Sequence, residues 1–174
     1  MLDVHPAQLI PVVTADHELN LMRRGLVPSW AKDPAITSRI INTINARAET
    51  VATKPSFKRP RARQLVSYPC LCLCRVAGTP GHKSKYRIAR QDDALFAFAG
   101  LHDAWRSPSG AELASCTIIT ATPNAVVAPI HDRMPAILPP EDEVAWFNPD
   151  LTEPEQVLPF LCPYPDDLLL ATPA

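Results

Sequence analysis

The proline content limits what this chain can fold into. Twenty of its 174 residues are proline and five are glycine. Proline fixes φ and has no N–H, so it interrupts helices and is confined to turns and strand edges. Short strands with long ordered connections are therefore expected, and a helical bundle is disfavoured. The length suffices for one domain with a sizeable core, and we expect a single domain over residues 1–174.

Short apolar and β-branched runs predict the strands. They lie at 8–13, 19–27, 64–76 (interrupted by Pro69), 86–89, 95–101 and 116–121. Capping residues predict four short helices: 45–53 with Asn45 as N-cap, a turn or two from Thr122–Pro123 to Pro129, 139–147, and a weaker one at 153–160. No final element is expected in the tail 163–174. This order predicts an α+β protein, with a mainly antiparallel sheet curled into a barrel and short flanking helices.

Charge is distributed unevenly along the chain. From Arg23 to Arg90 there are 15 Lys and Arg against two acids, whereas from Ser107 onward ten acids accompany one base, Arg133. Such a basic stretch can bind a polyanion, most commonly nucleic acid. The alternative is that the two halves pack together and neutralise each other.

No apolar run approaches the roughly 20 residues of a membrane span. The start "MLDVHPAQLI" has neither a basic region nor a long apolar region, so it does not resemble a signal peptide. These features predict a cytoplasmic protein with no membrane partner, associated with the nucleoid when it is bound to DNA.

The five cysteines are an odd number, which argues against a disulfide framework. Cys70, Cys72 and Cys74 would face one side of a continuous strand. Zinc sites, however, generally use C-x2-4-C pairs, so no metal and no cofactor is predicted.

Three polar stretches are candidates for chemistry. In "IHDRMP", His131 and Arg133 lie on a predicted loop, where histidine can transfer a proton near neutral pH or simply tie the loop down. In "NARAET", Asn45 and Arg47 can address a phosphate or carbonyl, or belong to an ordinary helix start. Trp30 can stack on a base or pack as a lid over the core.

Four stretches resemble the SRAP family, the SOS response-associated peptidases or abasic-site processing proteins. They are "GLVPSWAKDPAI", "INARAETVATKPSF", "FAFAGLHDAW" and "TIITATPNAVVAPIHDRMPAILPPED". The resemblance implies binding of single-stranded DNA with an abasic site, in the DNA damage response. It also implies that the thiol and α-amine of an N-terminal cysteine close a thiazolidine with the sugar aldehyde, a covalent crosslink. The peptidase label refers to self-processing of residues before that cysteine.

The resemblance also assigns roles to residues. Asn45 would orient the reacting groups, and His131 would be the general acid/base. Arg47 and Arg133 would hold DNA phosphates, and Trp30 would present an aromatic ring at the lesion. No cofactor and no obligate protein partner is implied.

The chain departs from the family pattern at three places. Leu2 stands where the family has its cysteine, Arg24 stands where it usually has tryptophan, and "SYPCLCLCRVA" replaces the segment with the catalytic glutamate. Compared with the family pattern, the first strand is also absent and the C-terminal strand is cut short at Ala174. Together these departures predict a domain incomplete at both ends and impaired in catalysis, and they leave a non-catalytic single-stranded-DNA-binding remnant as the alternative. A reading-frame disturbance over 64–77 is one hypothesis for the third departure.

Overall fold

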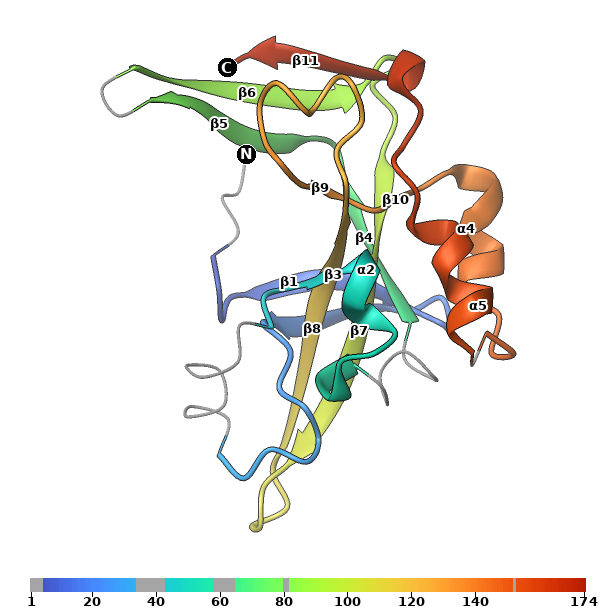
Figure 1. Ribbon diagram of the computed structural model, residues 1–174. Coiled ribbons are helices and arrows are strands. Elements are labelled where there is room, and N and C mark those ends of the chain that lie inside the picture. The colour runs from blue at the N-terminus through green and yellow to red at the C-terminus, as the bar shows by residue number, and fades with distance from the viewer. Residues whose placement is uncertain (1–4, 34–42, 58–64, 80–81, 152) are drawn as a thin grey trace.

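The computed structural model describes residues 5–33, 43–57, 65–79, 82–151 and 153–174 (Figure 1). Its strands are β1 (Leu9–Thr14), β2 (Leu19–Arg24), β3 (Asn45–Arg47), β4 (Leu65–Cys70), β5 (Leu73–Thr79), β6 (His82–Arg90), β7 (Phe96–Arg106), β8 (Glu112–Ala121), β9 (Met134–Pro135), β10 (Ile137–Leu138) and β11 (Leu169–Pro173). Its helices are α2 (Ala48–Val51), α4 (Pro140–Trp146) and α5 (Pro154–Val157), with 3-10 turns at Leu158–Leu161 and Asp166–Leu168. Leu2 lies outside the described residues.

The main sheet closes on itself. Its strands pair in the order β7–β4–β1–β2–β8, and β8 pairs back onto β7. These pairings are antiparallel except β2–β8, and β3 also joins β8 in parallel. The predicted α+β class is therefore confirmed, and the expected curl takes the form of a ring of strands within a mixed sheet.

A second, smaller sheet lies across one end of the ring and has the order β11–β6–β5 (Figure 1). The expectation of a tail without a final element is wrong, because β11 pairs with β6 from Leu169 opposite Arg90 to Pro173 opposite Tyr86. Leu169 is buried and Leu170 is exposed, the alternation of a strand with one covered face. The tail forms a strand because the edge of β6 is available for pairing. The sequence of the tail alone does not reveal this partner.

Two expected helix starts are also wrong. Asn45 is not an N-cap but begins β3, which pairs with β8 at Ile118, and the helix α2 follows with Arg47 as its N-cap. Pairing with β8 holds Asn45–Arg47 extended, so the helix begins only at Ala48. The segment after Thr122 forms successive turns rather than a helix, with the Asn124 side chain accepting a hydrogen bond from the Val127 N–H. Two separate i→i−4 bonds occur there, from the Ala128 N–H to the Asn124 carbonyl and from the His131 N–H to the Val127 carbonyl, but Pro129 has no N–H to continue them into a helix.

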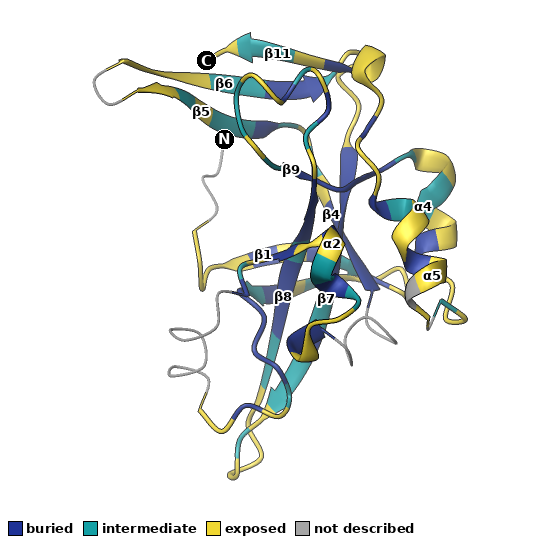
Figure 2. Ribbon diagram, viewed as in Figure 1, coloured by how far each residue is buried: buried dark blue, intermediate teal, exposed yellow. Residues whose placement is uncertain are grey.

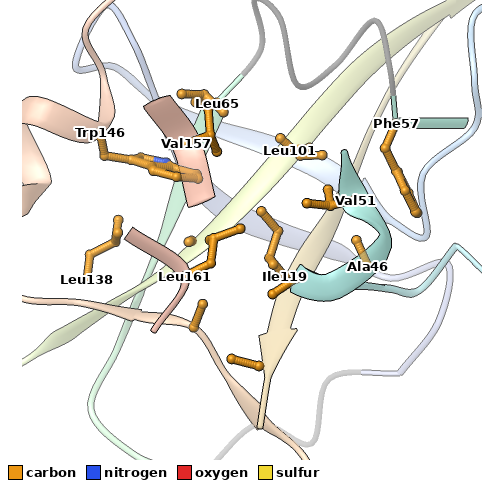
Figure 3. Packing of buried hydrophobic residues seen from close by; sticks show 14 of the residues in the cluster. Ala46, Val51, Phe57, Leu65, Leu101, Ile119, Leu138, Trp146, Val157 and Leu161 are labelled. Atoms are coloured by element: carbon orange, nitrogen blue, oxygen red, sulfur yellow. The ribbon is translucent and has the colours of Figure 1, made fainter. Parts of the chain in front are cut away.

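One buried cluster lies between the ring and the helices α4 and α5, and a second includes Leu73, Ile88 and Leu169 of the smaller sheet. Figure 2 shows buried residues concentrated in the strands of the ring. Trp146 is fully buried, and its indole N–H donates to the Val66 carbonyl at 3.0 Å. The same cluster contains other apolar side chains (Figure 3), among them Leu65, Leu101, Leu138, Val157 and Leu161. Within the described residues, no helix has the length and apolarity required to cross a bilayer.

Gly100 allows β7 to approach Tyr68 closely. A Cβ at this position would lie 2.1 Å from Tyr68 Cε2 and 2.7 Å from the Thr117 carbonyl oxygen. Because backbone in the middle of a sheet yields little, Gly100→Ala is expected to lower the free energy of unfolding by about 1–3 kcal/mol. Urea denaturation measures this cost, and an unchanged midpoint would show that the Tyr68 ring does not lie against β7.

Candidate functional site

A basic groove lies where the ring of strands meets the smaller sheet. Its volume is about 840 Å³. The groove is lined by Arg24, Asn45, Arg47, Lys54, Cys74, Arg75, Val76, Lys85, Thr120, His131 and Arg133. Six of these side chains are cationic, and no described lining residue is a carboxylate. Such a concentration of one charge attracts an anionic ligand.

β3 presents two polar side chains on one side. Asn45 and Arg47 are exposed and flank the buried Ala46, so the amide and the guanidinium both face the groove. Pairing with β8 fixes this orientation, and the Thr120 hydroxyl donates to the Ala46 carbonyl at 3.2 Å. The two residues therefore project from the sheet itself rather than from a helix end.

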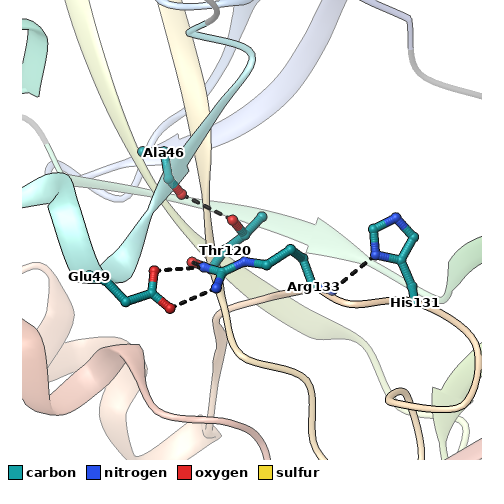
Figure 4. A network of polar contacts seen from close by, with 5 residues as sticks. All are labelled: Ala46, Glu49, Thr120, His131 and Arg133. Atoms are coloured by element: carbon teal, nitrogen blue, oxygen red, sulfur yellow. Dashed lines mark hydrogen bonds and ion pairs between the residues drawn. The ribbon is translucent and has the colours of Figure 1, made fainter.

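His131 Nδ1 has a partner whether or not it carries a proton. The backbone N–H of Arg133 donates to His131 Nδ1 at 3.0 Å (Figure 4), which requires that nitrogen to be unprotonated. The same Nδ1 lies 2.9 Å from Asp132 Oδ1, a contact that requires a proton on Nδ1. The two contacts exclude each other, so the first belongs to the tautomer with its proton on Nε2 and the second to a ring with a proton on Nδ1. This arrangement suits a proton donor and acceptor.

Arg133 and Glu49 form a bidentate ion pair beside the histidine. Arg133 Nη1 lies 2.6 Å from Glu49 Oε1, and Nη2 lies 2.9 Å from Oε2 (Figure 4). Arg133 also donates to the Thr120 carbonyl. The hydrogen bonds from Arg133 lower the pKa of the Glu49 carboxyl. The pair joins α2 to the segment after His131 and so fixes this wall of the groove.

Glu49→Gln is expected to destabilise the protein in a pH-dependent way. Because the folded state lowers the Glu49 pKa, its stabilisation is present above the unfolded value of 4.5 and is lost as pH falls through the folded value. The carboxylate is half-exposed and screened, so the loss at pH 7 should not exceed about 1 kcal/mol. Chemical denaturation at several pH values measures it. An equal difference between the two proteins at about pH 7 and about pH 3 would contradict the role of the ion pair.

The structure brings together Asn45, Arg47, His131 and Arg133, four of the five residues singled out from sequence. The fifth, Trp30, is 56% exposed and does not line this groove. Sequence reasoning missed Arg24, Lys54, Arg75, Lys85 and Thr120 as lining residues. The excess of basic residues between Arg23 and Arg90 is the sequence signal that indicates the four cationic ones among these.

The three neighbouring cysteines do not lie on one strand face, contrary to expectation. Cys70 ends β4, Cys72 lies between strands, and Cys74 belongs to β5. Cys70 donates through its thiol to the Cys72 carbonyl at 2.8 Å. A break of two residues between β4 and β5, which belong to different sheets, thus interrupts the strand. The part of the chain that is described contains no group of three His, Cys, Asp or Glu side chains able to hold a metal ion.

By its fold and its groove, the chain is an α+β protein with a closed ring of strands and a cationic site. The family model for the SOS response associated peptidase (SRAP) matches residues 1–174, and the chain belongs to this family. It is 42% identical over 173 residues to the abasic site processing protein YoqW of Bacillus subtilis, covering 95% of this chain and 74% of YoqW. It is 29% identical over 163 residues to the abasic site processing protein HMCES of Mus musculus, covering 78% of this chain and 46% of HMCES.

Solved structures agree with this assignment. A crystal structure of a Bacteroides thetaiotaomicron protein superposes with a TM-score of 0.89 and 30% identity, covering 96% of this chain and 74% of that one. A Bordetella bronchiseptica protein superposes with a TM-score of 0.85 and 24% identity, covering 98% and 86%. The second similarity concerns the fold alone. The family model and the names of the curated relatives support a family role in abasic site processing.

Proposed function

We propose that the basic groove binds single-stranded DNA at an abasic site. The observation that carries this proposal is the meeting of six cations with Asn45 and His131 in one groove, without a described carboxylate in its lining. Cations serve the phosphates of a strand, and an amide and an imidazole serve the sugar. An abasic nucleotide carries no base, so a protein can reach its sugar without extruding a base from the stack.

The groove residues have distinct roles in this proposal. Arg47 and Lys54 are exposed and contact phosphates directly. Both terminal nitrogens of Arg133 are engaged by Glu49 and Thr120, so it contributes positive charge from the groove wall. Asn45 orients the ring-opened sugar, and His131 exchanges a proton with it through Nε2, because Nδ1 already has partners.

The covalent step implied by the family resemblance needs a thiol and a free amine on one residue. The aldehyde would first condense with the amine and release water, and the thiol would then add to the imine. Among the described lining residues the thiol is that of Cys74, and its backbone nitrogen belongs to a peptide bond inside β5, so it is not a free amine. This observation favours non-covalent binding as a second candidate function.

Gel electrophoresis with a single-stranded oligonucleotide that carries one abasic site tests both candidates. A heat-stable shifted band on a denaturing gel, weaker for His131→Ala, would support covalent capture. A shift on a native gel alone would support non-covalent binding. If neither gel shows a shift, while an intact oligonucleotide of the same length also remains unbound, the proposed function is wrong.

A further inference from the structure

A small apolar pocket lies beside α4 and shares no described lining residue with the basic groove. Its volume is about 230 Å³. Sites for drug-sized ligands are generally larger, roughly 300–1,000 Å³, so this pocket suits a single bulky side chain. Its walls come from β1 and the turn after it, from the start of β7 and from α4, and they include Val13, His17, Leu95, Glu143, Val144 and Phe147.

The rim of the pocket is apolar and exposed to solvent. Leu95, which directly precedes β7, is 56% exposed, and Val144 of α4 is 74% exposed. The rings of His17 and Phe147 meet edge to face with 5.4 Å between their centroids, so the turn after β1 is held against the end of α4. Single exposed apolar side chains are common on protein surfaces, whereas several around one pocket indicate a contact site.

The outer face of β1 and β2 continues this apolar surface. Val13 lines the pocket and pairs with Leu19, and Pro11 pairs with Leu21. Leu9, Leu19 and Leu21 are each at least 65% exposed. These residues alternate with the buried, inward-facing ones of the two strands, so they share one face of the sheet. A sheet face with three exposed leucines next to a pocket is typical of a surface that a partner covers.

Carboxylates flank the pocket on both sides. Asp16 and Glu18 are exposed in the turn beside His17, and residues 141–143 in the first turn of α4 are all acidic. Partial burial raises the pKa of the Glu143 carboxyl. The charge of Arg90 opposes this shift, but that guanidinium is engaged by Asp92 at 2.9 and 2.6 Å. The surroundings of the pocket are therefore complementary to positive charge.

We propose that this pocket and the adjoining face of β1 and β2 bind a basic segment of a partner polypeptide. One bulky apolar side chain of the segment occupies the pocket as its anchor, and flanking lysines or arginines face the carboxylates. The acidic flanks oppose binding to an anionic lipid surface. The cationic groove repels the same segment, so the partner and an anionic ligand of the groove occupy separate sites.

Calorimetric titration of the full chain with the blocked pentapeptide KKWKK tests the proposal. We expect KKWKK to bind at least about tenfold more tightly than EEWEE or KKAKK, because these lack the charge or the anchor. Leu95→Gln and Val144→Gln should weaken binding of KKWKK about tenfold, and Glu143→Gln about 2–5-fold. The matched control is Leu170→Gln, which alters a leucine of β11 that is 53% exposed and does not line the pocket. This variant should bind KKWKK as the wild type does.

Four results would overturn the proposal. The first is a wild-type Kd for KKWKK above about 1 mM, and the second is equal affinity for KKWKK and EEWEE or for all the variants. N-acetyltryptophanamide that binds as tightly as KKWKK would assign the pocket to a small apolar molecule instead. A wild-type dimer in gel filtration that Val144→Gln converts to a monomer would assign the surface to a second copy of the chain.

Discussion

Raising the salt concentration from about 50 to about 200 mM is expected to lower the affinity for abasic single-stranded DNA by about 100-fold. The groove offers six cationic side chains, enough to neutralise about five phosphates of a bound strand. Release of the counterions of those phosphates gives a plot of log affinity against log salt concentration a slope of about −0.7 per phosphate. Fluorescence anisotropy titrations over a salt series give this slope. An affinity independent of salt would contradict binding through the groove cations.

Single substitutions test which cationic side chains contribute to the slope of log affinity against log salt concentration. Arg47→Gln should reduce its magnitude by about 0.7, because one phosphate contact is lost. Arg106→Gln should leave it unchanged, since Arg106 is 78% exposed at the far end of β7 and pairs with Glu112. Equal effects of the two variants would indicate a general surface charge effect rather than a localised site.

Trp146→Ala is expected to lower the free energy of unfolding by about 3–5 kcal/mol. The indole is completely buried, stacks edge-on against Phe160 with 5.8 Å between ring centroids, and donates to the Val66 carbonyl. The substitution removes this volume and leaves a buried carbonyl without its donor. Chemical denaturation followed by circular dichroism measures the loss.

Trp146→Phe provides the matched control for this prediction. It keeps an aromatic ring in the core but removes the hydrogen bond to Val66, so it should cost less than the alanine variant, about 1–3 kcal/mol. A loss below about 1 kcal/mol for Trp146→Ala would mean that α4 does not anchor the core as described.

The predictable part of the site is the part encoded in contiguous motifs. "NARAET" and "IHDRMP" are separated by about 80 residues, yet Asn45, Arg47, His131 and Arg133 line one groove. Polar and apolar residues alternate at Asn45–Arg47, although the capping pattern of the sequence predicts a helix start there. The choice between strand and helix there depends on the partner β8, which sequence periodicity does not report.

Tertiary pairing explains the features that sequence reasoning missed. β11 exists because β6 offers an edge, and Leu169 becomes buried only in that pairing. Arg75 and Lys85 reach the groove because β5 and β6 pair into a second sheet over the ring. Their basic character was evident, whereas their meeting with Arg24 from β2 depends on how the two sheets are arranged.

The most direct test of DNA binding in the groove is the alkylation rate of Cys74 with and without saturating abasic single-stranded DNA, measured by peptide mass spectrometry. Cys74 lines the groove, whereas Cys162 is exposed, does not line it, and serves as the internal reference. We predict that DNA slows alkylation of Cys74 and leaves the rate at Cys162 unchanged. Unaltered alkylation of Cys74 in a saturated complex would show that the strand binds elsewhere and would contradict the central claim.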